Sequence, residues 1–230
     1  NARQFDEVAQ LAKEKQLILM EGFTLYHMPI YPKMQALIKA GKFGEIKMIQ
    51  INFGSLKDYD PQNRFFNKDL AGGALLDIGG YATAFAISFM DEYPESINTT
   101  VKFFETGVDE ESGIILKNSK GQMAVMSLSM RAKQPKRGLV SGTKGYFEIN
   151  QYPRGTEAYI TYTQSAHEES YDKVTAGEAD QALEYEVTDF QKYIEQGHDE
   201  GELEKSRMIA HILTSIRTAW GMTYPFDNEE

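Results

Sequence analysis

An aspartate and a tyrosine four residues apart carry the clearest chemical signal in this sequence. Asp77 and Tyr81 lie in the segment Gly-Gly-Ala-Leu-Leu-Asp-Ile-Gly-Gly-Tyr, residues 72–81. In a helix, side chains four residues apart share a face. A phenol beside a carboxylate can donate or accept a proton, provided that a nearby cation lowers its pKa from about 10. The alternative is a packed helix in which Asp77 caps a turn and Tyr81 is half-buried.

The same segment holds four glycines, which indicates that something packs closely against its backbone. Each glycine in a helix interior costs about 1 kcal/mol relative to alanine. The surrounding stretch, residues 71–90, is twenty residues long with Asp77 as its single charge. That length would span a membrane. The glycines and the central aspartate favour a buried helix of a soluble protein instead, so we expect no membrane partner.

The composition narrows the class of protein. The chain has 230 residues, 41% hydrophobic and 25% charged, which is typical of a globular protein. Its formal net charge of −10 disfavours binding to a nucleic acid backbone. It has no cysteine, so disulfides and thiolate metal sites are excluded, and a reducing cytoplasm is the expected location. No cluster of histidine and carboxylate residues has metal-ligand spacing, so we predict no metal.

The first residues predict a piece of a parallel α/β sheet. Apolar residues recur at helical spacing over residues 5–12 without a convincing cap before them, so the chain is expected to begin in mid-helix. The apolar run at residues 17–20 predicts a buried strand. A helix followed by a buried strand is one step of an α/β sheet. We therefore expect residues 1–24 to be the tail of a larger domain.

The rest of the chain predicts an α+β domain over residues 25–230. A helix at residues 29–40 precedes a strand at residues 45–53, in which Ile46 and Met48 alternate with Ile49 and Ile51. A long polar loop and the glycine-rich helix follow. Short β-like runs are then separated by turn residues and predict a mostly antiparallel open sheet with helices packed on one face. These runs are residues 97–104, 113–116, 123–130, 138–141, 146–149 and 158–163, and two helices at residues 179–195 and 203–220 close the chain.

One basic cluster stands out in this acidic chain. Arg131, Lys133, Lys136 and Arg137 lie within seven residues of one another. Such a group could contact a 2′-phosphate or a partner subunit. A solvated loop is the interpretation that we favour.

Six segments of the chain, taken in order, resemble one protein family. They are Met-Glu-Gly-Phe at residues 20–23, residues 37–46, Asn-Arg-Phe-Phe-Asn at residues 63–67, residues 72–81, residues 185–190, and Gly-Met-Thr-Tyr-Pro at residues 221–225. Their order and spacing resemble the glucose–fructose oxidoreductase and inositol dehydrogenase (Gfo/Idh/MocA) family, most closely its dihydrodiol-dehydrogenase-like branch. The resemblance covers nearly the whole chain.

The resemblance implies an NAD- or NADP-dependent oxidoreductase acting on a sugar, polyol or diol. It makes Tyr81 the proton-transfer residue and Asp77 a residue that orients the substrate or catalytic groups. It also implies a homodimer formed through the sheet. The remaining implied contacts are His27, Tyr26 and Arg64 for substrate, and Glu21 and Gly22 for cofactor.

Two departures from the family pattern change what we expect of the domains and the activity of this chain. The family's catalytic lysine, in a Glu-Lys-Pro motif, is absent, and so is the G-x-G-x-x-G dinucleotide fingerprint. Residues 1–24 are therefore expected to be the remnant of a dinucleotide-binding domain, and residues 25–230 a substrate-binding and dimerisation domain inactive alone. Tyr26 stands where relatives usually carry arginine. The alternative is a non-catalytic binding or scaffold protein that retains the family's sheet.

Overall fold

A single sheet of eight strands organises the chain in the computed structural model, which describes residues 1–165 and 167–228. The strand order is β2-β3-β4-β1-β5-β6-β7-β8, and every neighbouring pair is antiparallel except β1 and β4. This confirms the predicted, mostly antiparallel open sheet. The strands are β1 (Ile46–Gly54), β2 (Ser96–Phe103), β3 (Asp109–Lys117), β4 (Met123–Ser129), β5 (Gln134–Gly142), β6 (Gly145–Asn150), β7 (Glu157–Ser165) and β8 (Glu168–Thr175).

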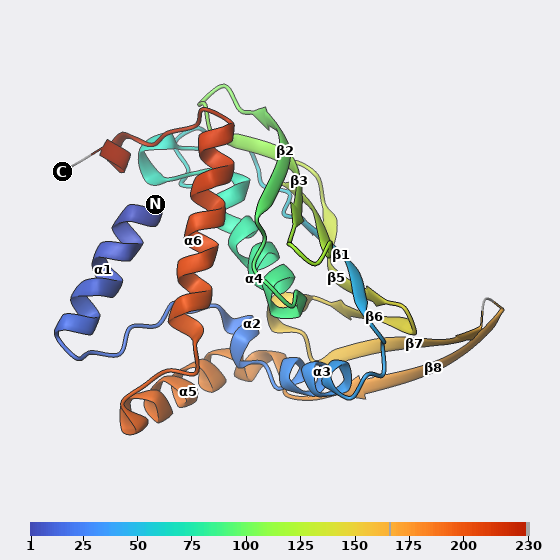
Figure 1. Cartoon of the computed structure of the whole chain (residues 1–230). Helices are drawn as coiled ribbons and strands as arrows, with labels where there is room; N and C mark the ends of the chain where they lie inside the picture. The colour runs from blue at the N-terminus through green and yellow to red at the C-terminus, as the bar shows by residue number, and fades with distance from the viewer. Residues whose placement is uncertain (166, 229–230) are drawn as a thin grey trace.

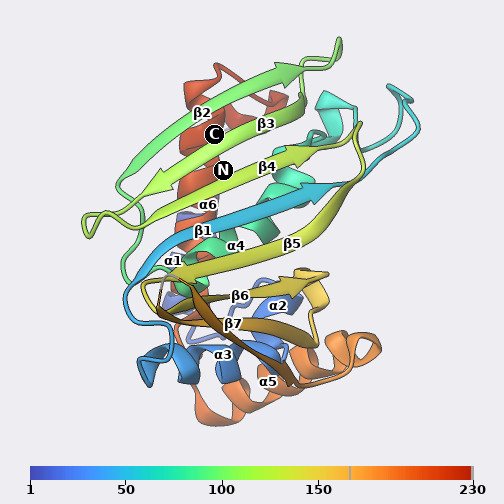
Figure 2. The same ribbon diagram turned by 90° about the vertical axis from the view of Figure 1, so that its right-hand side faces the viewer.

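The helices cover one face of this sheet and leave the other open, as the two views show (Figures 1 and 2). Helix α4 lies between the sheet and α6, and α1 packs on the outer side of α6. The α-helices are α1 (Ala2–Glu14), α2 (Thr24–His27), α3 (Ile30–Lys39), α4 (Gly80–Phe89), α5 (Ala182–Gln196) and α6 (Glu202–Ala219). A π-helical turn η2 (Leu75–Gly79) leads into α4, and short 3-10 turns are η1 (Lys68–Leu70), η3 (Tyr152–Arg154), η4 (Ala179–Gln181) and η5 (Pro225–Asn228).

Strand β1 occupies the middle of the sheet although it comes first in the sequence. It is inserted between β4 and β5, which therefore do not pair with each other. A register irregularity between Ile46 and Met48 shifts the alternation of the strand. As a result Ile46, Ile49, Ile51 and Phe53 are all buried, whereas the sequence alternation placed Ile46 and Ile49 on opposite faces.

Strand β8 was missed by the sequence prediction. It pairs only with β7, at the edge of the sheet, and most of its residues are exposed. Its sequence, Glu-Glu-Ser-Tyr-Asp-Lys-Val-Thr, lacks an alternation of apolar and polar residues. Charged residues are a common feature of edge strands because they discourage pairing with another chain. An edge strand of this kind gives no apolar signal.

The glycine-rich segment forms the centre of the core, but not as one regular helix. Residues 75–79 form a π-turn before α4 begins at Gly80, so the prediction of a regular helix over residues 72–90 is wrong at its first turns. Lys68–Phe89 is long and apolar enough to span a membrane, and 72% of its most apolar window is buried inside the fold. This confirms the interpretation of the segment as a buried helical core element.

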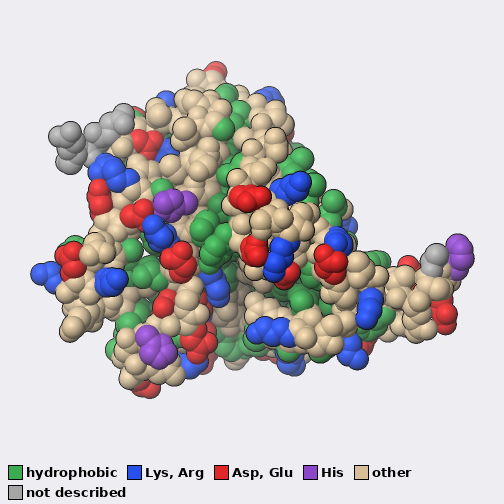
Figure 3. All heavy atoms as spheres, viewed as in Figure 1, with side chains coloured by type: hydrophobic (Ala, Val, Ile, Leu, Met, Phe, Trp, Pro, Cys, Tyr) green, Lys and Arg blue, Asp and Glu red, His purple; other side chains and the backbone are tan. Residues whose placement is uncertain are grey.

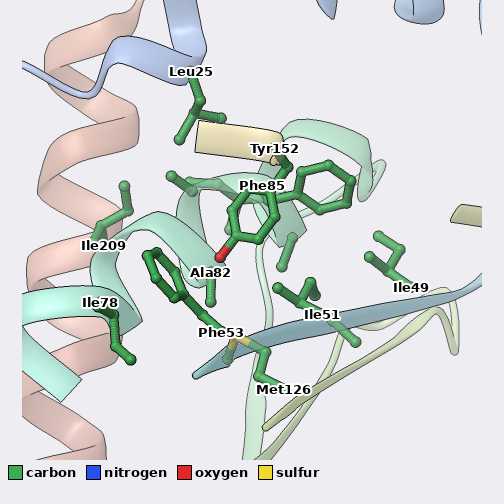
Figure 4. Packing of buried hydrophobic residues seen from close by; sticks show 14 of the residues in the cluster. Leu25, Ile49, Ile51, Phe53, Ile78, Ala82, Phe85, Met126, Tyr152 and Ile209 are labelled. Carbon is green, nitrogen blue, oxygen red and sulfur yellow. The ribbon is translucent and has the colours of Figure 1, made fainter. Parts of the chain in front are cut away.

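Aromatic rings from three elements meet beneath α4. Phe85 of α4 contacts Tyr152 of η3 at 5.1 Å between ring centroids, and Phe53 of β1 lies 6.1 Å from Tyr152 (Figure 4). The Phe85 ring lies directly over Gly138 of β5, where an added Cβ would come within 2.2 Å of the ring. Only glycine fits at this position, so the close contact between α4 and the sheet depends on it.

We expect Gly138→Ala to lower the free energy of unfolding by about 1–3 kcal/mol, because the new methyl forces Phe85 out of its position. Urea denaturation measures the change. Gly113→Ala is the matched control, because Gly113 also lies in a strand and its Cβ would meet Thr100 at an ordinary 3.6 Å. Equal stability of the two variants would contradict the proposed packing.

The first twenty residues depart from two predictions. Helix α1 begins at a complete capping box, in which the Asn1 side chain accepts a hydrogen bond from the Gln4 backbone N–H and Gln4 bonds back to Asn1. The expectation of an uncapped start in mid-helix is therefore wrong. Residues 17–20 form no strand, and Leu17 is exposed. A strand requires a neighbour for its backbone groups, and none of the described strands lies beside this run.

Candidate functional site

Tyr81 lies in the first turn of α4, and its position depends on the glycine before it. The Tyr81 ring packs edge-on against Phe23, with centroids 5.4 Å apart. Phe23 also covers Gly80, where an added Cβ would come within 3.1 Å of the phenylalanine ring. This confirms that a group packs closely on the glycine-rich backbone. Among the described residues the Tyr81 hydroxyl has no hydrogen-bond partner, so it is free to bond a ligand.

Asp77 forms an ion pair with Arg64, one of the other predicted site residues. Arg64 Nη1 lies 3.0 Å from Asp77 Oδ1, and the guanidinium also stacks over the Phe65 ring at 4.0 Å. The Arg64 side chain is 65% exposed, whereas that of Asp77 is 20% exposed. The pair therefore adds little stability. It presents a carboxylate and a guanidinium together, and both can bond a substrate hydroxyl.

A first cleft of about 540 Å³ holds Asp77 and Tyr81 in its wall. It lies between α1, α6 and the start of α4, on the face where Figure 3 shows hydrophobic side chains among charged ones. Glu21 also lines this cleft. Most other lining groups are apolar, including Phe5, Val8, Leu19, Met20, Phe23, Leu76, Ile209 and Leu213. The π-turn thus brings Asp77 and Tyr81 to one cavity, as the sequence spacing suggested.

A second cleft, of about 610 Å³, also has Tyr81 in its wall. It lies at the end of β1 and the start of β5 and contains two cations, Lys136 and Arg154. Its other lining residues are Thr24, Phe53, Gln151, Pro153, Ala179 and Asp180. Tyr81 is the residue common to both clefts.

Lys136 is a site residue that the sequence analysis assigned to a solvated loop. It lies in β5, two residues before Gly138, and successive odd and even positions of a strand face opposite sides. Because Gly138 faces Phe85 and Val140 is buried, Lys136 projects from the helix-covered face of the sheet. Its half-buried side chain lies with Nζ 4.8 Å from the centre of the Phe53 ring. In the sequence, the alternation of Lys136 with Gly138 and Val140 along one strand was the pattern that could have placed Lys136 on the helix-covered face.

His27 and Tyr26 do not reach either cleft. The His27 side chain is fully buried, with Nδ1 2.8 Å from the Asp189 carboxylate and Nε2 3.7 Å from that of Glu202. The Tyr26 hydroxyl is also buried, and it has no hydrogen-bond partner among the described residues. Burial raises the pKa of Tyr26 well above its ordinary value. Neither side chain lines a cleft with Tyr81, and their contact with substrate stays a prediction.

The two predicted cofactor residues have different surroundings. Glu21 lies in the wall of the first cleft, which Tyr81 also lines. Gly22 faces Glu186 instead, because an added Cβ there would come within 2.7 Å of the Glu186 carboxylate. The structure thus places Glu21 at the cleft, whereas the glycine serves to accommodate a neighbouring side chain.

A buried carboxylate, Asp109, supports the turn that carries Asp77. Its Oδ2 accepts a hydrogen bond of 2.7 Å from the Leu75 backbone N–H. Its Oδ1 has no partner among the described residues and lies where a side chain on Gly73 would be. Burial raises the pKa of Asp109 to about 7, despite the backbone donors of Leu75 and Ala74, which lower it.

This raised pKa predicts a pH-dependent stability. Between about pH 4 and 7 the folded chain keeps a proton on Asp109 that the unfolded chain loses, so this contribution to stability falls as the pH rises. We expect Asp109→Asn to gain a few kcal/mol relative to the native chain between pH 5 and 8, as measured by urea denaturation. Asp58→Asn, at an exposed carboxylate, should show no such trend. A parallel pH dependence of Asp109→Asn and the native chain would refute this assignment.

Comparison with known proteins gives the same family at the level of sequence. Residues 31–148 match the Gfo/Idh/MocA C-terminal domain. The chain is 31% identical over 234 residues to trans-1,2-dihydrobenzene-1,2-diol dehydrogenase of Xenopus tropicalis, and 27% identical over 236 residues to the human enzyme of that name. These alignments cover 98% and 99% of the chain and 69% of each relative.

Solved structures share the fold. Levoglucosan dehydrogenase, in complex with NADH and levoglucosan, superposes with a TM-score of 0.82 at 18% identity, covering 96% of this chain and 68% of that one. A 3-ketoreductase from Actinomadura kijaniata, in complex with NADP and TDP-benzene, superposes with a TM-score of 0.80 at 21% identity, covering 95% and 67%. The matched domain, the dehydrogenase relatives and the shared open sheet agree: this chain belongs to the Gfo/Idh/MocA family of oxidoreductases.

Proposed function

We propose that this chain forms the substrate-binding part of an NAD(P)-dependent oxidoreductase that moves a hydride to or from a carbon of a sugar, polyol or diol. The position of Tyr81 carries the proposal, because its unbonded hydroxyl belongs to a residue that both clefts share. The names of the relatives support it, because they are dehydrogenases and a ketoreductase.

The residues of the chain account for the proton side of the reaction. In the reducing direction the Tyr81 hydroxyl donates its proton to the carbonyl oxygen, and in the oxidising direction the Tyr81 phenolate takes the proton of the substrate hydroxyl. The Asp77–Arg64 pair bonds neighbouring hydroxyls and so fixes which carbon faces Tyr81. Proton transfer of this kind contributes about 10²- to 10⁴-fold to the rate.

The first cleft suits the nicotinamide end of a dinucleotide. Its mostly apolar walls fit a flat ring, and Glu21 offers one carboxylate at its edge. When bound, the dinucleotide supplies or accepts the hydride. No two glycines of the chain are separated by one residue, so the sequence holds no glycine-rich loop for the diphosphate. The residues of this chain therefore fit the nicotinamide end of the dinucleotide and not its diphosphate.

A division of the chain near residue 24 is part of the proposal. Residues 1–24 would belong with the dinucleotide-binding domain and residues 25–230 would form the substrate domain. In support, no residue before Phe23 belongs to the buried core. The relatives are longer than this chain, so we expect residues 1–230 alone to bind NADPH weakly and to be inactive. Calorimetric titration tests this, and micromolar affinity would contradict it.

Hydride transfer itself is tested with the full-length protein. Oxidation of NADH and NADPH is followed with a panel of aldoses, ketoses and diketones, and the reverse reaction with polyols and diols. Turnover with members of this panel is the expected result. Absence of turnover with every compound and both dinucleotides would favour the scaffold alternative.

The open face of the sheet is proposed as the surface that pairs two copies of the chain. Helices leave this face uncovered in Figure 2, and it carries exposed apolar side chains at Ile115, Tyr146 and Tyr159. Burial of such groups stabilises association. Light scattering should give the mass of a dimer, and Ile115→Glu should shift it towards the monomer. A monomeric native chain at micromolar concentration would rule this out.

A further inference from the structure

Two cations, Lys136 and Arg154, line the second cleft, and two more, Lys57 and Lys133, act on the charge of Lys136. Lys57, Lys133, Lys136 and Arg154 form no ion pair with another described residue. Burial lowers the pKa of Lys136, and the positive charges of Lys133, Lys57 and Arg154 lower it further. The three other cations therefore raise the cost of a positive charge on Lys136.

The wall of the second cleft carries two cations and one carboxylate, although the whole chain has a net charge of −10. Lys102 and Lys173, by contrast, are paired with Glu110 and Glu157, both at 2.6 Å. The one acidic group in the wall of the second cleft is Asp180, which forms no ion pair with a described residue. Holding like charges together near low-dielectric walls costs free energy that a bound anion would offset.

Packing fixes the Lys136 side chain, and it anchors the turn that carries the exposed Arg154. Lys136 extends from β5 over the Phe53 ring, at 4.8 Å from its centre. Arg154 ends η3, whose first residue, Tyr152, is fully buried and accepts a hydrogen bond of 2.7 Å at its carbonyl from the Tyr31 hydroxyl. The two cations therefore approach one cleft from separate, anchored elements.

We propose that the second cleft binds an anionic group of the substrate, a carboxylate or a phosphate, through Lys136 and Arg154, and so presents the reacting carbon to Tyr81. The inference rests on the proposed function and narrows its substrate class to acidic or phosphorylated sugars and polyols. Because Arg154 can bond two oxygens of a planar or tetrahedral anion and Lys136 acts as a point charge, both anions suit the pair.

Calorimetric titration with three sugars that differ only at C6 tests the proposal. D-glucose is neutral there, D-glucuronate carries a carboxylate and D-glucose 6-phosphate a phosphate. At low salt we expect at least one anionic sugar to bind about tenfold or more tightly than glucose, and its affinity to fall with added salt. Comparison of the two anionic sugars identifies the preferred anion.

Substitutions of the two cations test whether they bind the anionic group of the sugar. Lys136→Met should weaken binding of the anionic sugar about tenfold, and Arg154→Met should do the same. Lys144→Met is the matched control, because Lys144 is an exposed lysine in the turn between β5 and β6, away from the cleft. Circular dichroism checks that each variant folds. The proposal is overturned if all three sugars bind equally or if neither anionic sugar binds. It is also overturned if Lys136→Met keeps the native affinity for the anionic sugar, or if inorganic phosphate binds as tightly as glucose 6-phosphate.

The possible results distinguish the proposed anion site from the proposed oxidoreductase function. Binding of an anionic sugar that depends on Lys136, without dinucleotide turnover in the full-length protein, supports the anion site and contradicts the oxidoreductase. Turnover of neutral sugars that is insensitive to Lys136→Met supports the oxidoreductase and contradicts the anion site.

Discussion

Tyr81→Phe is expected to lower kcat of the full-length protein by about 10²- to 10⁴-fold while its fold and substrate affinity change little. The substitution removes one oxygen and keeps the ring that packs on Phe23 at 5.4 Å. The expected loss is that of a general acid or base. Steady-state kinetics with NADPH and the best carbonyl substrate measure it.

Tyr93→Phe is the matched control for this experiment. Tyr93 is 39% exposed and lines neither cleft, so its loss of a hydroxyl should leave kcat unchanged. If Tyr81→Phe keeps the native kcat, Tyr81 is not the proton-transfer residue. If only KM rises, the hydroxyl binds substrate without transferring its proton.

Asp227→Asn is expected to lower the free energy of unfolding by about 3–5 kcal/mol, because it leaves a buried guanidinium without its counter-charge. Arg217 of α6 is 5% exposed, and its two terminal nitrogens lie 2.7 and 3.1 Å from the two Asp227 oxygens. The carboxylate also accepts hydrogen bonds from the Tyr224 backbone and from Asn1. One side chain thus joins the end of the chain to α6 and to the cap of α1.

The same pair has a predicted pH dependence. The Arg217 guanidinium holds the pKa of Asp227 well below its usual value. This contribution to stability is therefore present above about pH 4 and is lost as the pH falls through the lowered pKa. Urea denaturation at pH 7 and at pH 3 should show a smaller effect of Asp227→Asn at the lower pH.

Two further variants make this prediction specific. Glu200→Gln breaks an exposed pair with Lys192 and should cost less than about 1 kcal/mol. The double variant Arg217→Met with Asp227→Leu removes both charges and should be more stable than Asp227→Asn alone, because no unpaired charge stays buried. A loss below about 1 kcal/mol for Asp227→Asn would show that water or other groups satisfy Arg217.

Much of the local structure could be predicted from the sequence because its signals lie between near neighbours. Helices at residues 29–40 and 203–220 were found from apolar residues at helical spacing, and the second has Ile209, Ile212 and Ile216 buried. The turn residues between the short β-like runs predicted hairpins, and β3–β4 and β5–β6 are antiparallel pairs of this kind. The clustering of glycines before Tyr81 predicted close packing on that backbone, which Phe23 provides.

The parts that could not be predicted depend on which distant segments meet. Insertion of β1 between β4 and β5 brings Phe53 beside Lys136, and no local pattern encodes that pairing. His27 was predicted at the substrate because it lies near the family's motif, but its surroundings are set by Asp189 and Glu202, more than 160 residues away.

The sequence by itself therefore determined most of the helices and strands, the family resemblance and the segment that carries Asp77 and Tyr81. Only the tertiary structure decided that Tyr81 lies between two clefts and that Lys136 and Arg154 line one of them. The physical reason is that helices, turns and glycine contacts arise from interactions along the chain. A binding site instead arises from burial and charge shared among elements that folding brings together.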